Sequence, residues 1–588
     1  MKIRSFLTAI AVMSCASPAA LAEKVQLRFE GETLPSDVRD AVRAGLTDEN
    51  RPETLFEARR QAERAENTVR DILNSRGYFD PQITAYVETN EVTTPVLEVE
   101  PGKLFLIEIL EIDYSDAEPN SEAAQDAFDA ITLAAGDTAI PAEIIDAERE
   151  ISFSLRRNGY AFAEAGDRRV QGDREAGELR VTYNVSAGHR VRLGEVIYPD
   201  DIITETDYLD RLRPFEAGDL YTPQGIAMFS GRLSETRLFD LANVRLAEEP
   251  TRIMENGDAV YDVIVTLSER ERNTVALGAS IATDVGPGVT AEFTRRNLTK
   301  NGDLLVAELT VAQLEQELDV QWRRPNEFGY GRGLVLSTTL SNENTDGFDS
   351  QEFAVGAGYE VVEGPDFSYS YGVTASLIHE QDEFGERDLQ LLGVYASARL
   401  DRADDFLNPT KGWRVEGRVD PNVAFGSSES QFIRAEGQLR GYLPFGEDRR
   451  LVLAGRLKLG TVWGADIEAL PSDDRFFSGG GGSVRGYAYQ AIGPRSDDDA
   501  PLGGRALLET SVEARWQFRQ NIGLVGFIDA GRVSETELPS FSDLRFGAGF
   551  GVRYDTPAGP LRVDIATPLD PTDFDDPVQI YIALGQAF

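Results

Sequence analysis

The sequence predicts a series of α+β repeats followed by an all-β transmembrane barrel of about 16 antiparallel strands. Three observations predict this fold class. Between Lys24 and Glu269, strand-like and helix-like patterns recur with a period of roughly 80 residues. After Asn273 the helical period disappears, and alternating apolar and polar residues continue to the end. No apolar run beyond the N-terminal region approaches the roughly 20 residues that a membrane helix requires.

The N-terminal residues have the pattern of a secretion signal. Two basic residues precede an apolar run over residues 6–13, and an Ala-Leu-Ala tripeptide that ends at Ala22 fits a signal-peptidase site. We expect residues 1–22 to be removed and the protein to be exported. A lipoprotein signal ending at Cys15 is the alternative. Because Cys15 is the only cysteine, we expect the mature protein to contain neither a disulfide nor a thiol nucleophile.

Composition argues against several classes of partner and cofactor. The formal net charge of −42 disfavours a nucleic-acid partner, because phosphate binding needs a basic surface. The two histidines, His189 and His379, are far apart and lack neighbouring residues in metal-ligand spacing. The glycine clusters at 479–482 and 547–551 are not followed by the Lys-Ser/Thr pair or the helix of a nucleotide site. We therefore expect no metal and no other cofactor.

The first repeat begins with a strand-like stretch, VQLRFEG, at residues 25–31. Apolar residues then follow the three-to-four spacing of a helix face: Leu55, Ala58, Ala62, Ala65, Val69 and Ile72. Two strand-like stretches close the repeat. The second repeat has the same order, and its Gly159-Tyr160 pair corresponds to Gly77-Tyr78. The third is looser, with TRLFDLANV in place of the Gly-Tyr segment. Each repeat is thus predicted as strand, helix, helix, strand, strand.

The predicted organisation has five parts: a signal peptide at 1–22, repeats at 23–102, 103–188 and 189–269, and a barrel at 270–588. In the barrel, the stretch FSYSYGVTASL at residues 367–377 places large apolar residues on one face and small, mostly polar residues on the other. One face suits lipid and the other water. About sixteen such segments, an even number typical of these barrels, begin near Thr274 and end with a strand near Val578.

The last predicted strand, VQIYIALGQAF, has two special positions. Phe588 is an aromatic residue at its end, which resembles an outer-membrane insertion signal; an ordinary edge strand is the alternative. Gly585 is expected to kink the strand, because glycine weakens a strand interior. We expect both residues to belong to a weak seam between the first and last strands.

A connection of roughly 40 residues, 465–504, separates the eleventh and twelfth predicted strands and is far longer than an ordinary hairpin loop. It contains RFFSGGGGSVRGY at residues 475–487, in which an arginine follows a run of four glycines. Arg485 inside a polar lumen would need carboxylates within reach. Strand alternation supplies lumen-facing partners on the next two strands: Glu513, Phe527, Asp529 and Gly531. A flexible surface loop with a solvated arginine is the alternative.

The stretch Val484, Arg485, Gly486 and Tyr487 resembles the Val/Ile-Arg-Gly-Phe/Tyr motif in the sixth loop of the BamA/TamA superfamily of outer-membrane assembly proteins. The stretches SVEARW at 511–516 and GFIDAG at 526–531 resemble its companion segments. The repeats resemble POTRA domains, with a generic α+β repeat as the alternative. Three such repeats fit the TamA branch better than BamA, which carries five.

The resemblance implies a bacterial outer-membrane location with periplasmic N-terminal domains. It implies an assembly factor that inserts or translocates autotransporters and other outer-membrane protein clients through the first/last-strand seam, without nucleotide hydrolysis. The implied partners are a TamB-like inner-membrane-anchored periplasmic protein, these clients and outer-membrane lipids. A substrate-specific secretion pore or passive channel of the two-partner secretion type is the alternative. We expect no enzyme, because no Ser-His-Asp arrangement is evident.

Overall fold

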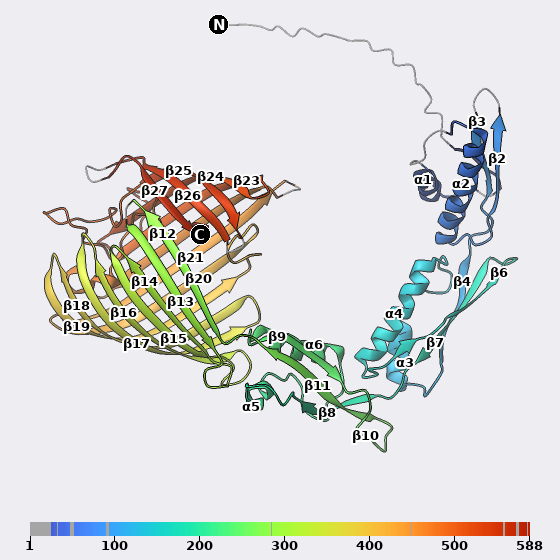
Figure 1. The fold of residues 1–588 in the computed structure, drawn as a ribbon, viewed down its shortest axis with the longest axis horizontal. Coiled ribbons are helices and arrows are strands. Elements are labelled where there is room, and N and C mark those ends of the chain that lie inside the picture. The colour runs from blue at the N-terminus through green and yellow to red at the C-terminus, as the bar shows by residue number, and fades with distance from the viewer. Residues whose placement is uncertain are drawn as a thin grey trace, which may run out of the picture. The chain divides into compact units, whose positions relative to one another are not determined.

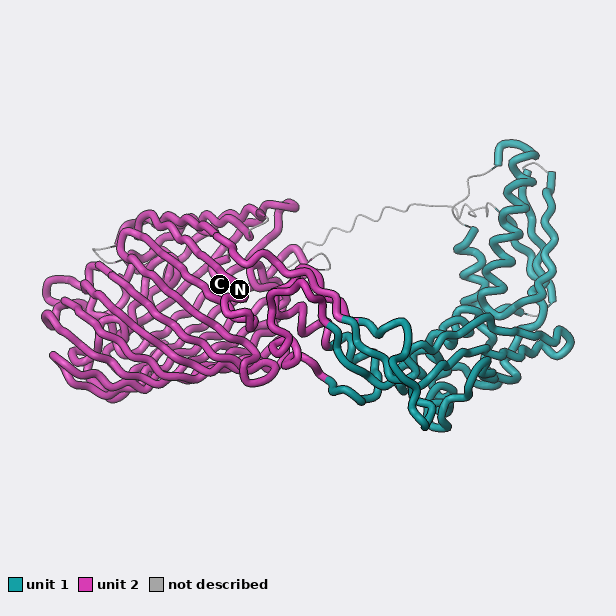
Figure 2. Tube along the Cα trace, turned by 60° about the horizontal axis from the view of Figure 1, so that its bottom comes forward, with its two compact units in different colours: residues 1–197, 215–228, 245–264 teal, residues 198–214, 229–244, 265–588 magenta. Residues whose placement is uncertain are grey.

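The structure is a computed structural model that describes residues 25–31, 33–46, 52–89, 93–283, 285–446, 449–556, 559–571, 575–584 and 586–588. The expected signal peptide at 1–22 lies outside the described residues. The chain divides into two compact units (Figure 2). The first comprises 1–197, 215–228 and 245–264, and the second comprises 198–214, 229–244 and 265–588.

The first small sheet has the predicted element order. Its elements are β1 (Gln26–Phe29), α1 (Ser36–Gly45), α2 (Leu55–Ser75), β2 (Gln82–Thr89) and β3 (Thr93–Glu100). The strands are ordered β1-β3-β2, so β1 and β2 form the two edges. Helix α2 begins after Thr54, whose hydroxyl accepts a hydrogen bond from the Glu57 backbone N–H. Of its predicted apolar face, Ala65, Val69 and Ile72 pack in the core of this sheet, whereas Leu55 at the start of the helix is exposed.

The second sheet contains more strands than predicted. Its elements are β4 (Leu106–Tyr114), α3 (Ser121–Asp129), α4 (Pro141–Arg157), β5 (Glu164–Ala165), β6 (Arg169–Asp173) and β7 (Glu178–Ser186). The strands are ordered β4-β7-β5, and β6 also pairs with β7. Short β6 is exposed along its length, so it lacks the buried alternating face that reveals a strand in sequence.

The third sheet is ordered β10-β11-β8, and β9 also pairs with β11. Its elements are β8 (Val191–Ile197), α5 (Thr206–Asp210), α6 (Pro223–Glu235), β9 (Phe239–Leu246), β10 (Arg252–Ile253) and β11 (Ala259–Glu269). The TRLFDLANV segment thus supplies β9. No described helix is both long and apolar enough to cross a membrane. The boundaries of the three repeats stay predictions.

The barrel is closed by sixteen consecutive antiparallel strands, which confirms the predicted number (Figure 1). They are β12 (Asn273–Ala282), β13 (Gly286–Arg296), β14 (Leu304–Ala312), β15 (Glu315–Arg324), β16 (Arg332–Asn344), β17 (Phe348–Glu363), β18 (Phe367–Asp382), β19 (Gly385–Asp401), β20 (Gly412–Gly426), β21 (Ser430–Phe445), β22 (Leu451–Trp463), β23 (Ala506–Arg519), β24 (Ile522–Ser534), β25 (Arg545–Thr556), β26 (Gly559–Pro568) and β27 (Gln579–Leu584). The long loop between β22 and β23 includes two short 3-10 helices, η1 (Ile467–Ala469) and η2 (Ser472–Asp474).

Alternation along the strands gives the barrel an apolar outer face and a polar lumen. On β18, Val373 and Leu377 are exposed, as expected for the outer face. On β23, Val512 is exposed on the outer face, whereas Glu513 and Arg515 are buried on the lumen side. Charged side chains are therefore directed into the lumen, where the long loop can reach them.

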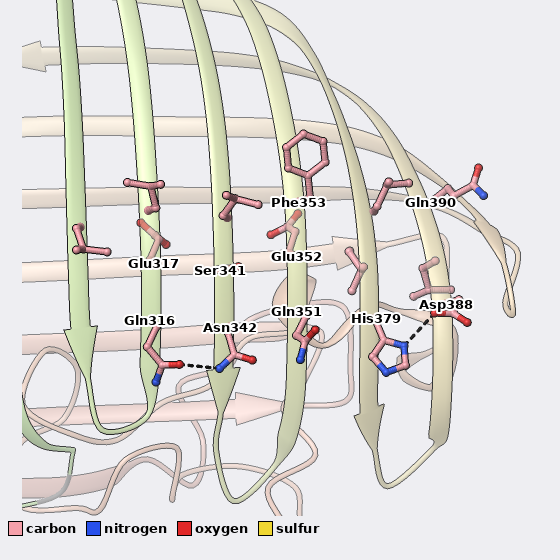
Figure 3. Close-up of a pocket in the computed structure, with 16 residues that line it drawn as sticks. Gln316, Glu317, Ser341, Asn342, Gln351, Glu352, Phe353, His379, Asp388 and Gln390 are labelled. Atoms are coloured by element: carbon pink, nitrogen blue, oxygen red, sulfur yellow. Dashed lines mark hydrogen bonds and ion pairs between the residues drawn. The ribbon is translucent and has the colours of Figure 1, made fainter.

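A row of polar side chains crosses the outer face of β15–β19 near the hairpins that join these strands (Figure 3). Its members lie in cross-strand register: Gln316, Asn342, Gln351, His379 and Asp388. These residues help to line a recess of about 790 Å³. The next outward-facing row is apolar on β15–β18, with Leu318, Leu340, Phe353 and Leu377, and has Gln390 on β19. The polar row therefore marks one limit of the apolar belt.

Candidate functional site: a loop arginine held inside the barrel

The loop between β22 and β23 is buried at the four motif residues that the sequence singles out. Val484, Arg485 and Tyr487 are each at most 2% exposed. Gly486 has a φ of +105°, and a Cβ there would lie 2.7 Å from the Thr567 carbonyl carbon on β26. Glycine is needed at this position because the backbone is both left-handed and close to a strand. The motif is therefore packed against the barrel wall.

Arg485 binds three buried carboxylates from three strands. Its Nε donates to Asp529 Oδ2 at 2.7 Å and its Nη2 donates to Asp529 Oδ1 at 2.9 Å, a bidentate contact with β24. Its Nη1 lies 2.7 Å from Glu513 Oε1 on β23 and 3.2 Å from Asp564 Oδ2 on β26. All four side chains are at most 3% exposed. We call these four residues the inner anchor; the contacts with Asp529 and Asp564 are charge-assisted hydrogen bonds, the strongest class of protein hydrogen bond, and the contact with Glu513 is an ion pair.

Two further arginines balance the charge of the inner anchor. Arg515 Nε lies 2.8 Å from Glu513 Oε2, and Arg553 pairs with Asp564. Arg485, Arg515 and Arg553 thus form ion pairs with the three carboxylates. Burial by itself would lower the pKa of Arg485, but hydrogen bonding and the negative charges of the carboxylates raise this pKa above its ordinary value. The arginine therefore stays charged, and its ion pairs hold the loop against the barrel wall.

Phe527 and Gly531, the other lumen-facing positions named from the sequence, contact the same motif. The Arg485 guanidinium carbon lies 3.4 Å from the centre of the Phe527 ring, in cation–π geometry. A Cβ at Gly531 would lie 2.6 Å from Val484 Cγ2, so glycine leaves the space that the valine fills. The Tyr487 hydroxyl lies 3.1 Å from the Phe546 carbonyl oxygen on β25. The structure thus brings the predicted loop and lumen residues together.

The glycine run is held by residues that sequence reasoning missed. Arg456 on β22 donates from Nη1 to the Gly482 carbonyl at 2.9 Å and from Nη2 to the Ser483 carbonyl at 2.8 Å. Glu509 on β23 accepts a hydrogen bond from Ser478 Oγ at 2.9 Å and one from Ser483 Oγ. Alternation places both charged residues in the lumen, but only the loop's path shows that they meet its backbone.

A second buried ion cluster, which we call the outer anchor, holds the first part of the loop. Arg475 pairs with Asp382 of β18, and each side chain is 1% exposed. Arg387 of β19 lies 2.9 Å from Asp382 and 2.7 Å from Glu380. Glu380 Oε2 in turn accepts a hydrogen bond from the Ser472 backbone N–H at 2.8 Å. The loop is therefore fastened to β18–β19 as well as to β23–β26.

The seam between β12 and β27 is short. In the described part of the chain, these strands are in register only at Ile281–Ile582 and Ala282–Tyr581. Hydrogen bonds between Thr283 and Ile580 extend the contact. By comparison, β26 and β27 pair over six residues, Leu561–Ala566 with Gln579–Leu584. Gly585, the expected kink, lies outside the described residues, so its role stays a prediction.

Phe588 does not lie on the last strand, contrary to the sequence expectation. β27 ends at Leu584, and Phe588 packs against Tyr442, Val452 and Ala454 on β21–β22. Arg515 Nη2 donates to the Phe588 carbonyl oxygen at 3.0 Å. Alternation along VQIYIALGQAF extends the strand too far, because the pattern of apolar and polar residues does not show where strand pairing ends. Its proposed role in insertion is still only a prediction.

The chain is similar to known proteins over the barrel and over part of the N-terminal repeats. Residues 297–588 match the model of the Omp85 superfamily domain. The chain is 25% identical over 434 residues to the outer membrane protein assembly factor BamA of Nitratidesulfovibrio vulgaris, covering 70% of this chain and 53% of that protein. It is 23% identical over 415 residues to BamA of Neorickettsia risticii, covering 67% and 54%. The chain thus spans about half the length of these curated relatives.

A solved structure shares the fold. It is BamA from Haemophilus ducreyi lacking POTRA domains 1–3, with a TM-score of 0.68 and 18% sequence identity. The match covers 82% of this chain and 100% of that chain. Together, the sixteen-stranded closed barrel and the family match show that this chain belongs to the Omp85 superfamily.

Proposed function

We propose that the protein is a bacterial outer-membrane assembly factor of the TamA type. It inserts or translocates autotransporters and other β-barrel clients through the β12–β27 seam, without nucleotide hydrolysis. The observation that carries the proposal is the short seam, with two register pairs between the described residues of β12 and β27. The names of the matched relatives, which are outer membrane protein assembly factors, support this function class.

The seam suggests how a client strand is accepted. Most of β12, from Asn273 to Ser280, pairs with β13 but is not in register with any described residue of β27. Such an edge carries backbone N–H and C=O groups that an extended client can pair with by β-augmentation. Because few pairs hold β12 to β27, opening the seam breaks little of the barrel's hydrogen-bond ladder. Client pairing then offsets the bonds that opening removes.

A disulfide across the seam should stop client assembly. We would introduce cysteines at Ile281 and Ile582, a register pair on the outer face, after replacing Cys15 with serine. Cα atoms of antiparallel partners lie about 4.5–5.5 Å apart, within reach of a disulfide. Oxidation should lower the assembly of an autotransporter client at least about tenfold, because it removes the free edge. Reduction should restore assembly.

The matched control places cysteines at Ile565 and Ile580, a register pair between β26 and β27. This disulfide locks two strands that remain paired in our proposal, so assembly should continue in the oxidised protein. The alternative, a secretion pore or passive channel, predicts equal ion conductance before and after the seam is locked. Undiminished client assembly with a verified Ile281–Ile582 crosslink would favour that alternative.

A periplasmic partner is proposed for the first small sheet, on the interpretation that the repeats are POTRA domains. Strands β1 and β2 are its edges, and an extended TamB-like protein anchored in the inner membrane can add to either by β-augmentation. Deleting residues 24–102 should abolish capture of this partner from solubilised membranes while the barrel still inserts. Heat-modifiable electrophoresis checks insertion. If the deletion variant still captures the partner fully, the partner binds another part of the chain.

A further inference from the structure

The last strand of the barrel contacts the loop motif through the side chain of Tyr581. This residue lies on β27 and is 2% exposed. It is in register with Ala282 across the seam and with Asp564, an inner-anchor residue, on β26. Tyr581 therefore stands between the seam and the inner anchor.

The hydroxyl and the ring of Tyr581 both touch the loop. The hydroxyl accepts a hydrogen bond from the Gly486 backbone N–H at 3.1 Å and donates to the Tyr487 carbonyl at 3.4 Å. The ring lies so close to Gly481 that a Cβ there would be 2.6 Å from Tyr581 Cδ1. Real Cβ contacts are essentially never that short. The Tyr581 ring thus packs directly against the backbone of Gly481.

The ring also belongs to a buried apolar cluster with Phe527, Val525 and Ala566. Phe527 is the residue whose ring stacks on the Arg485 guanidinium. Arg485 therefore contacts Phe527, which shares a buried cluster with Tyr581, and Tyr581 in turn lies at the seam. A change at either end alters the packing of the other, because buried side chains leave little free space.

A cavity lies beside Tyr581, between part of the loop and the two seam strands. A cavity of about 350 Å³ is lined by the glycine run, including Gly481 and Gly482, and by Ser280, Ile281, Tyr581 and Ile582 from the two seam strands. The cavity separates part of the loop from β12. The tyrosine thus joins the loop to β27 at the edge of this cavity.

We propose that Tyr581 is a positioning residue that couples the anchored loop to closure of the seam. The loop holds β27 in place through this tyrosine, so release of the loop favours seam opening, and seam opening loosens the loop. The reciprocity follows from thermodynamic linkage, because each event changes the free energy of the other by the same amount. This coupling goes beyond the proposed assembly function and is measurable without a client.

Replacing Tyr581 with phenylalanine tests the coupling while keeping the ring. The measurement is the rate of disulfide formation between cysteines at Ile281 and Ile582, which reports the closed seam. Losing a hydrogen bond of ordinary strength should lower this rate about two- to tenfold. Tyr442→Phe is the matched control, because Tyr442 is a buried barrel tyrosine whose hydroxyl has no hydrogen-bond partner among the described residues. The control should retain the parental rate.

A second pair of variants tests the coupling from the loop. Gly481→Ala places a methyl group against the Tyr581 ring, whereas a Cβ at the neighbouring Gly482 meets no atom within 4 Å. Neither glycine has a positive φ, so alanine suits both backbones. Gly481→Ala should slow seam crosslinking and Gly482→Ala should not. Heat-modifiable electrophoresis confirms that each barrel is assembled.

The outcomes separate this inference from the proposed function. Parental crosslinking rates in both Tyr581→Phe and Gly481→Ala would overturn the coupling, even if a locked seam stops client assembly. If Gly481→Ala fails to assemble, Tyr581→Phe decides by itself. Slower crosslinking in Tyr581→Phe, together with client assembly that ignores the seam disulfide, would support the coupling and reject assembly through the seam.

Discussion

Replacing Arg485 with alanine should lower the free energy of unfolding of the barrel by about 3–5 kcal/mol and release the part of the long loop around the Val484–Tyr487 motif. The arginine side chain is 3% exposed and faces the side chains of Glu513, Asp529 and Asp564, which are 0–1% exposed. Removing it leaves Asp529 without an ion-pair partner among the described residues, because Arg515 pairs with Glu513 and Arg553 pairs with Asp564. An unpaired buried charge is costly because it has lost hydration without gaining a partner.

Urea unfolding of the barrel in lipid vesicles, followed by tryptophan fluorescence, measures this loss. Arg532→Ala is a matched control, because Arg532 also lies on β24 but pairs with Asp543, which is 85% exposed. Exposed ion pairs contribute about 0–1 kcal/mol, so the control should change stability little. If the two alanine variants unfold at the same urea concentration, the inner anchor does not hold the loop.

Two further variants distinguish lost charge from lost shape. Arg485→Lys keeps the charge but cannot make the bidentate contact with Asp529, so its stability should be intermediate. Combining Arg485→Met with Asp529→Asn removes one charge of each sign, and part of the lost stability should return. A double variant that is less stable than either single variant would contradict the electrostatic explanation.

Alternation explains why much of the fold and part of the inner anchor could be predicted. A strand directs every second residue to one face, so Glu513 and Asp529 could be assigned to the lumen from the sequence. The sixteen strands and the superfamily resemblance were confirmed, whereas the TamA branch stays a prediction. Alternation along LRVDIAT, residues 561–567, also places Asp564 in the lumen. Its contact with Arg485 could not be predicted, because it depends on the path that the long loop takes inside the barrel.

Contacts across the lumen could not be predicted in this way. Alternation says which face a residue occupies, but it does not say which lumen-facing residues meet, because that depends on the stagger of the strands and the path of the loop. Arg475 is the first residue of the RFFSGGGGSVRGY stretch, yet its partner Asp382 lies 93 residues earlier. Tyr581 is equally remote from Gly486, 95 residues along the chain.

Asp382→Ala should destabilise the loop more than Arg475→Ala, because Asp382 is shared by two buried arginines. Without Arg475, Asp382 keeps its contact with Arg387 at 2.9 Å. Without Asp382, Arg475 and Arg387 have only Glu380 as a remaining carboxylate in the outer anchor. We expect a loss of about 3–5 kcal/mol for Asp382→Ala and a smaller loss for Arg475→Ala.

Alkylation of single cysteines shows which part of the loop each variant releases. Leu470 and Val484 are both 0% exposed, the first near the outer anchor and the second beside the inner anchor. In a Cys15→Ser background, Asp382→Ala should increase maleimide labelling of a cysteine at Leu470 far more than of one at Val484. Arg485→Ala should do the reverse. Equal labelling of both cysteines in each variant would mean that the loop is released as one cooperative unit. The inner and outer anchors would then be energetically coupled rather than independent.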